Sequence, residues 1–78
     1  MSLLTNADKL NIVNQHIKSL DFQIYNSEID LLEANAESPV NTEFITTINA
    51  RIAAMNTKRA ALAAEAAPLA ASLESVEE

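Results

Sequence analysis

The fold is decided by residues 45–62, which read ITTINARIAAMNTKRAAL. Apolar side chains recur here at alternating intervals of three and four residues, and the same spacing continues to residue 76. Arg59 is the one polar residue on this line. The ten positions are Ile45, Ile48, Ile52, Met55, Arg59, Leu62, Ala66, Leu69, Leu73 and Val76. This spacing puts them on one face of an α-helix and is typical of a coiled-coil seam.

An earlier stretch of the chain carries a matching line. Its members are Leu10, Val13, Ile17, Leu20, Ile24, Ser27, Leu31 and Ala34. If the chain folds back between Asn35 and Ser38, the two lines face each other, with Leu20 level with Met55. Glycine is absent, and the helical periodicity is strong. We therefore predict an all-α fold, an antiparallel hairpin of two helices over about residues 5–34 and 39–66.

Local signals suggest where the helices begin and end. Thr5 and Asp8 have the spacing of a capping box at the first helix. Asn35 suits the left-handed residue that often ends a helix. Ser38 and Pro39 suit the N-cap and the first position of the second helix.

Pro68 interrupts the second helical pattern. A proline inside a helix removes a backbone hydrogen bond and clashes with the preceding turn, so we expect a kink or an end near residues 64–67. We therefore divide the chain into a hairpin over residues 1–67 and an acidic extension over 68–78, which is either a kinked helix or a frayed tail.

Arg59 interrupts the apolar line of the second helix and is expected level with Ile17. Its stem can pack in the seam while the guanidinium reaches water or an acid such as Asp21. The alternatives are an anchor for an anionic ligand and a residue that sets the register of an oligomer.

Composition excludes several functional classes. The 78 residues include no Cys and no Gly, and only one His. These counts exclude a disulfide framework, a cysteine-ligated metal, a two-histidine metal site and the glycine-rich phosphate loops. His16 and the acids Glu28, Asp30 and Glu33 form no converging set, so they are interpreted as solvated surface. We expect no catalytic, cofactor-binding or metal-binding residue, and no enzyme.

Charge and hydropathy narrow the range of partners. Eleven acids against five bases give a net charge of −6, which disfavours nucleic acid and anionic membranes. The most apolar stretch falls well short of the roughly 20 residues that a membrane span requires. We expect a cytoplasmic protein, located in the host cytoplasm if the chain is viral.

Each predicted helix has apolar surface left over. The first carries Phe22, Tyr25, Ile29 and Leu32, roughly 130° around the helix from its seam, with Leu4 and Ala7 on the same line. The second carries a line of small residues at alternating spacings of four and three. These are Thr46, Ala50, Ala53, Thr57, Ala60, Ala64, Ala67 and Ala71. Alanine is also the best helix former, so this line has an alternative explanation as an exposed, stable helix surface.

Two helices cannot bury two faces each, so the leftover surface predicts self-association. The candidate interface residues are Phe22, Tyr25, Ile29, Leu32, Ala50, Ala53, Thr57, Ala60 and Ala64. A two-fold dimer forming a four-helix bundle is the simplest closed assembly, and a trimer is the next. The predicted function is a structural, scaffold or adaptor component. The alternative is a small regulatory protein, such as one encoded by a phage, that binds another protein through its apolar helix face.

Overall fold

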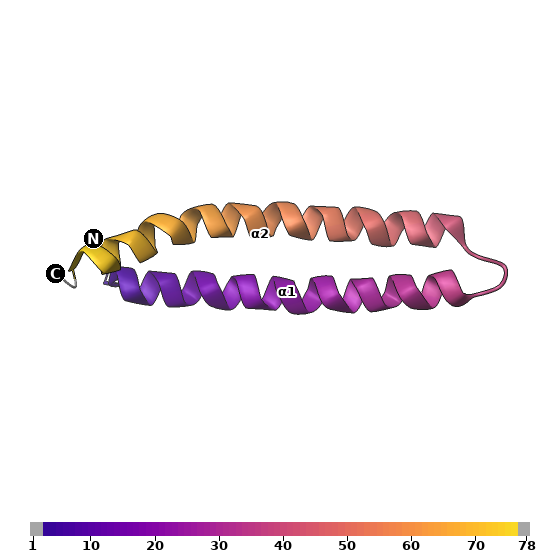
Figure 1. Ribbon diagram of the computed structural model, residues 1–78, viewed down its shortest axis with the longest axis horizontal. Coiled ribbons are helices and arrows are strands. Elements are labelled where there is room, and N and C mark those ends of the chain that lie inside the picture. The colour runs from indigo at the N-terminus through magenta and orange to yellow at the C-terminus, as the bar shows by residue number, and fades with distance from the viewer. Residues whose placement is uncertain (1–2, 77–78) are drawn as a thin grey trace.

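The computed structural model is a hairpin of two long helices, with residues 3–76 placed in the backbone and side chains described for residues 3–73. Helix α1 covers Asn6–Ala36 and helix α2 covers Thr42–Val76. The helices run antiparallel side by side, so that the start of α1 lies near the end of α2 (Figure 1). The molecule measures 60 × 21 × 17 Å. The predicted all-α, two-helix fold is confirmed.

The two predicted seams form the contact between the helices. Every seam residue from Leu10 to Leu73 is buried or half-buried, whereas most other positions of both helices are exposed. Ile48 is fully buried, and the seam residues Leu20, Ser27, Ala34 and Met55 expose less than a tenth of their surface. Val76, the last predicted seam position, lies outside the described side chains.

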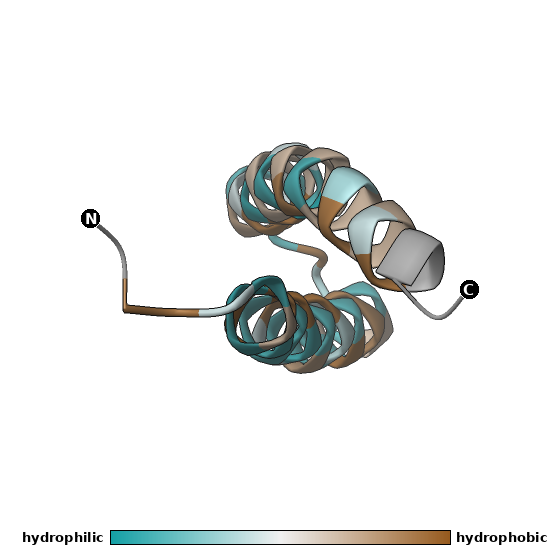
Figure 2. Ribbon diagram, turned by 90° about the vertical axis from the view of Figure 1, so that its left-hand side faces the viewer, coloured by the Kyte–Doolittle hydropathy of each residue, from teal (hydrophilic) through white to brown (hydrophobic). Residues whose placement is uncertain are grey.

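Hydrophobic residues are not confined to this contact. In the view along the hairpin, hydrophobic colour also appears on the outer edges of both helices, whereas the first turns of α1 are mostly hydrophilic (Figure 2). The core is therefore a single narrow seam, and apolar surface remains outside it.

The predicted capping box begins α1. Thr5 Oγ1 accepts a hydrogen bond from the Asp8 amide at 3.1 Å, and Asp8 Oδ2 accepts one from the Thr5 amide at 3.2 Å. Two otherwise unpaired amides at the helix start are satisfied in this way.

The connection between the helices differs from the prediction. Asn35 is not left-handed: it stays within α1, and its side-chain amide donates to the Leu31 carbonyl at 3.0 Å. The cap is Glu37, whose extended backbone lets its amide donate to the Ala34 carbonyl.

Helix α2 also begins later than expected, because Asn41 rather than Ser38 is the N-cap. Asn41 Oδ1 accepts a hydrogen bond from the Phe44 amide at 3.1 Å, and asparagine caps a helix at least as well as serine. Pro39 therefore belongs to the connection and not to the helix.

Two polar contacts between the helices define their register. Asn6 Nδ2 donates to Ser72 Oγ at 2.8 Å, and Arg59 Nε donates to Asp21 Oδ1 at 2.6 Å. The paired residue numbers add up to 78 and 80, whereas Leu20 paired with Met55 would give 75. The expected pairing is therefore wrong by about one helical layer, because α2 starts three residues later than predicted. Leu20 lies level with Arg59.

Pro68 does not end α2, which continues through it to Val76. The last turns of α2 bend toward the N-terminal end of α1 (Figure 1). Leu69, Ser72 and Leu73 are half-buried there, and the hydrogen bond from Asn6 holds this end to α1. These contacts offset the backbone hydrogen bond that the proline removes.

Replacing Ile48 by alanine tests the seam. Because Ile48 is fully buried, Ile48→Ala should lower the free energy of unfolding by about 2–5 kcal/mol. The matched control is Ile12→Ala in α1, since Ile12 lies outside the seam and is 42% exposed. Urea unfolding followed by circular dichroism measures both. Equal losses in the two variants would contradict the seam.

Candidate interaction surface

Four apolar side chains of α1 that lie outside the seam form one group, Phe22, Tyr25, Ile29 and Leu32, which we call the aromatic patch. Phe22 and Tyr25 are each 64% exposed and Leu32 is 67% exposed, while Ile29 is half-buried. They lie at spacings of three, four and three residues, so they share one side of the helix. The predicted residues are thus brought together as a surface that the hairpin itself does not cover.

The N-terminal members of the same predicted line are also exposed. Leu4 is 47% exposed, and Ala7 is exposed one turn later. Polar residues, including Asn11 and Lys18, separate them from the aromatic patch. The patch therefore occupies the half of α1 nearest the connection.

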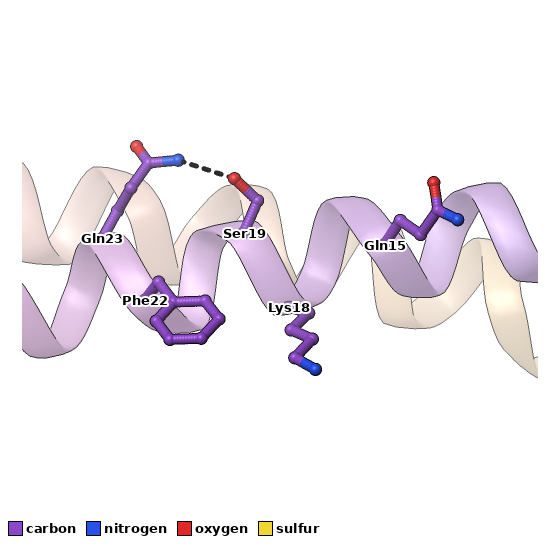
Figure 3. Close-up of a pocket in the computed structure, with 5 residues that line it drawn as sticks. All are labelled: Gln15, Lys18, Ser19, Phe22 and Gln23. Atoms are coloured by element: carbon purple, nitrogen blue, oxygen red, sulfur yellow. Dashed lines mark hydrogen bonds between the residues drawn. The ribbon is translucent and has the colours of Figure 1, made fainter.

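Shallow depressions flank the aromatic patch. One of about 320 Å³ is lined by Lys18, Asp21, Phe22 and Tyr25, and one of about 370 Å³ lies around Gln15, Lys18 and Phe22. Each takes its lining from α1 alone, so it is open surface and not an enclosed cavity. Figure 3 shows Phe22 and Lys18 pointing to one side of α1, away from Gln23 and Ser19, which hydrogen-bond each other at 3.2 Å.

The predicted line of small residues on α2, here called the small-residue stripe, is exposed along its whole length. Its members are Thr46, Ala50, Ala53, Thr57, Ala60, Ala64, Ala67 and Ala71. The two threonine hydroxyls donate within the helix, from Thr46 to the Thr42 carbonyl at 2.9 Å and from Thr57 to the Ala53 carbonyl at 3.1 Å. A partner could therefore cover the stripe without stranding an unpaired donor.

Charges on α2 avoid the small-residue stripe. Between Phe44 and Leu73 the exposed charged residues are Arg51, Lys58 and Glu65. They are seven residues apart, so they form a single line along the helix. Arg59, the remaining charge, belongs to the seam. One whole side of α2 is thus uncharged for about seven turns, a feature that the composition alone does not reveal.

An ion pair lies beside the aromatic patch. Arg59 reaches out of the seam to Asp21, with Nε 2.6 Å from Oδ1 and Nη2 3.4 Å from Oδ2. The expectation that its stem packs while its head meets Asp21 is confirmed. The hydrogen bond from Arg59 lowers the pKa of Asp21, and the same bond raises the pKa of Arg59. Both side chains remain about half exposed, so the pair contributes little to stability by itself.

The other polar candidates are not assembled into a site. His16, Glu28, Asp30 and Glu33 are all exposed on α1. Among the described residues, no three acidic, histidine or cysteine side chains gather closely enough to hold a metal ion. Neither helix, within that same part of the chain, has an apolar stretch suited to crossing a bilayer.

Comparison of the chain with protein-family models, curated proteins and solved structures finds no match.

The ion pair predicts a specific pH dependence. Because the pKa of Asp21 is lowered in the folded state, the pair stabilises the hairpin above the ordinary pKa of 3.8, and the contribution disappears as the pH falls through the lowered value. Asp21→Asn should therefore melt below the unsubstituted chain at pH 7, and the difference should vanish in strong acid. Thermal melts by circular dichroism at a series of pH values measure this. A difference that does not change with pH would contradict the pair.

Proposed function

We propose that the chain acts by associating with copies of itself, as a non-enzymatic structural, scaffold or adaptor component, and that a two-fold dimer is the simplest form of the assembly. The proposal rests on one observation: a single copy leaves too much surface uncovered. The hairpin exposes 5854 Å², whereas a compact 8.4 kDa monomer would expose about 4,600 Å². The excess is roughly 1,200 Å² per copy.

The elongated shape has the same consequence. The radius of gyration is 17.6 Å, against about 11.5 Å for a compact chain of this length. A rod of two helices has only one internal face, and here that face buries Leu20, Ala34, Ile48 and Met55 as its hydrophobic core. Further association would add core without adding chain, as in helical bundles.

The surface left over is suited to a protein partner. The aromatic patch is mostly exposed, and the small-residue stripe is uncharged. Contiguous apolar patches of several hundred Å² on a soluble chain usually mark interaction sites. We propose the aromatic patch and the small-residue stripe as the interface, including the predicted residues Ala60 and Ala64.

A concentration series tests self-association. Sedimentation velocity of the full chain from about 1 to 100 µM should show an oligomer, and Ala64→Glu should weaken it at least about tenfold, since an unpaired charge would be buried. The control is Gln23→Glu, which adds the same charge on the side of α1 away from Phe22 (Figure 3). A folded monomer at every concentration would overturn the proposal.

The aromatic patch also supports the second candidate function, a regulatory protein that docks this patch on a different protein. The two candidates predict different behaviour of the isolated chain, because a docking protein would remain monomeric with the aromatic patch in water. The same sedimentation series, with the absorbance of Tyr25 as a probe of its environment, therefore separates them.

A further inference from the structure

The aromatic patch and the small-residue stripe occupy the same heights along the hairpin. Residues of α1 and α2 at the same height have numbers that add up to about 79, as the Asn6–Ser72 and Asp21–Arg59 contacts establish. In this register Phe22 is level with Thr57, and Tyr25 with Ala53. Ile29 is likewise level with Ala50, and Leu32 with Thr46. Four bulky side chains on one helix thus correspond, layer by layer, to four small ones on the other.

Within one copy these surfaces cannot touch. Phe22, Tyr25 and Leu32 are exposed on α1 while Ala50, Ala53 and Thr57 are exposed on α2, because both sets face away from the seam. A second copy related by rotation about an axis parallel to the hairpin would place its α2 beside α1 at the same heights. It would run antiparallel to α1, as the first copy's own α2 does.

We infer that the aromatic patch of one copy packs on the small-residue stripe of a second copy, in the pairs Phe22 with Thr57, Tyr25 with Ala53, Ile29 with Ala50 and Leu32 with Thr46. This inference rests on the proposed self-association and adds which surfaces meet. The contact joins two different surfaces. A dimer with a two-fold axis therefore contains this contact twice, and an assembly with a higher rotational axis is a closed ring in which each copy contacts the next.

The area available fits such a contact. At roughly 200 Å² per aromatic side chain, the 64% exposure of Phe22 and Tyr25 leaves about 260 Å² in water from these two residues alone. A stable interface takes roughly 800 Å² from each partner. The excess surface of about 1,200 Å² per copy is sufficient, provided that both the aromatic patch and the small-residue stripe are covered.

Shape and charge favour a second copy over an unrelated partner. Bulky side chains need shallow hollows, and a line of alanine and threonine lets a neighbouring helix approach closely. The stripe has its threonine hydroxyls already paired within α2, and between Phe44 and Leu73 its side of the helix carries no charge. A partner that covered only the aromatic patch would leave this second surface exposed.

Disulfide trapping tests the pairing. Only the introduced cysteines can form cross-links, because the chain itself has no cysteine. Full-length Ile29→Cys and Ala50→Cys chains, one lengthened by a size tag, are mixed and oxidised mildly. The mixed cross-link should exceed that in either variant alone by about tenfold or more, since disulfides require Cα atoms within about 7 Å. Both substituted positions lie outside the buried core, so the hairpin should still fold.

The matched control is Asp30→Cys mixed with Ala50→Cys. Asp30 is exposed at nearly the same height as Ile29 but is turned about 100° around α1, away from the proposed contact. It should give little cross-link.

Four results would overturn the pairing. If the Ile29→Cys chain alone cross-links to the same extent as the mixture, the aromatic patches of two copies contact each other. Equal cross-linking of the Asp30→Cys control would mean random collision. An oligomer by sedimentation without the mixed cross-link would refute the pairing but leave the proposed function standing, whereas a monomer would refute both.

Discussion

One constraint governs this molecule: two helices share a single buried face. Apolar residues at alternating spacings of three and four meet along that face, and Ile48 is fully buried in it. Everything outside the seam, including apolar side chains, stays in contact with water. The hairpin is consequently a rod of 60 Å with a thin core and an unusually large surface for its mass.

Because only one face is buried, the apolar residues outside the seam require an explanation. On a larger globule an exposed phenylalanine or a run of alanines would need no explanation. Here the aromatic patch and the small-residue stripe lie at matching heights on the two helices. Between Phe44 and Leu73, the exposed charges of α2 keep to a separate line through Arg51, Lys58 and Glu65. The distribution of charge and bulk, and not the amount of either, distinguishes these surfaces and supports their covering by a second copy.

The Asp21–Arg59 pair connects the core to this surface. Arg59 occupies a seam position, so its aliphatic stem takes the place of an apolar residue while its guanidinium leaves the seam beside the aromatic patch. Exposed ion pairs add little to stability, but a charged residue in a seam penalises registers in which it has no partner. The pair is therefore better explained as a determinant of register than as a source of stability.

The sequence by itself determined the two helices, the residues of their seam and the capping box at Thr5. Each follows from short-range periodicity or from spacing within one helical turn. The tertiary structure decided three further points: that Asn41 and not Ser38 caps α2, that α2 continues through Pro68, and hence which residues lie level across the hairpin. Several residues in the connection are competent caps, and proline lowers the stability of a helix without forbidding it. Packing of Leu69 and Leu73 near α1, with the bond between Asn6 and Ser72, favours a helix that continues through Pro68, because contacts between segments distant in the chain outweigh differences of about 1–3 kcal/mol in local propensity.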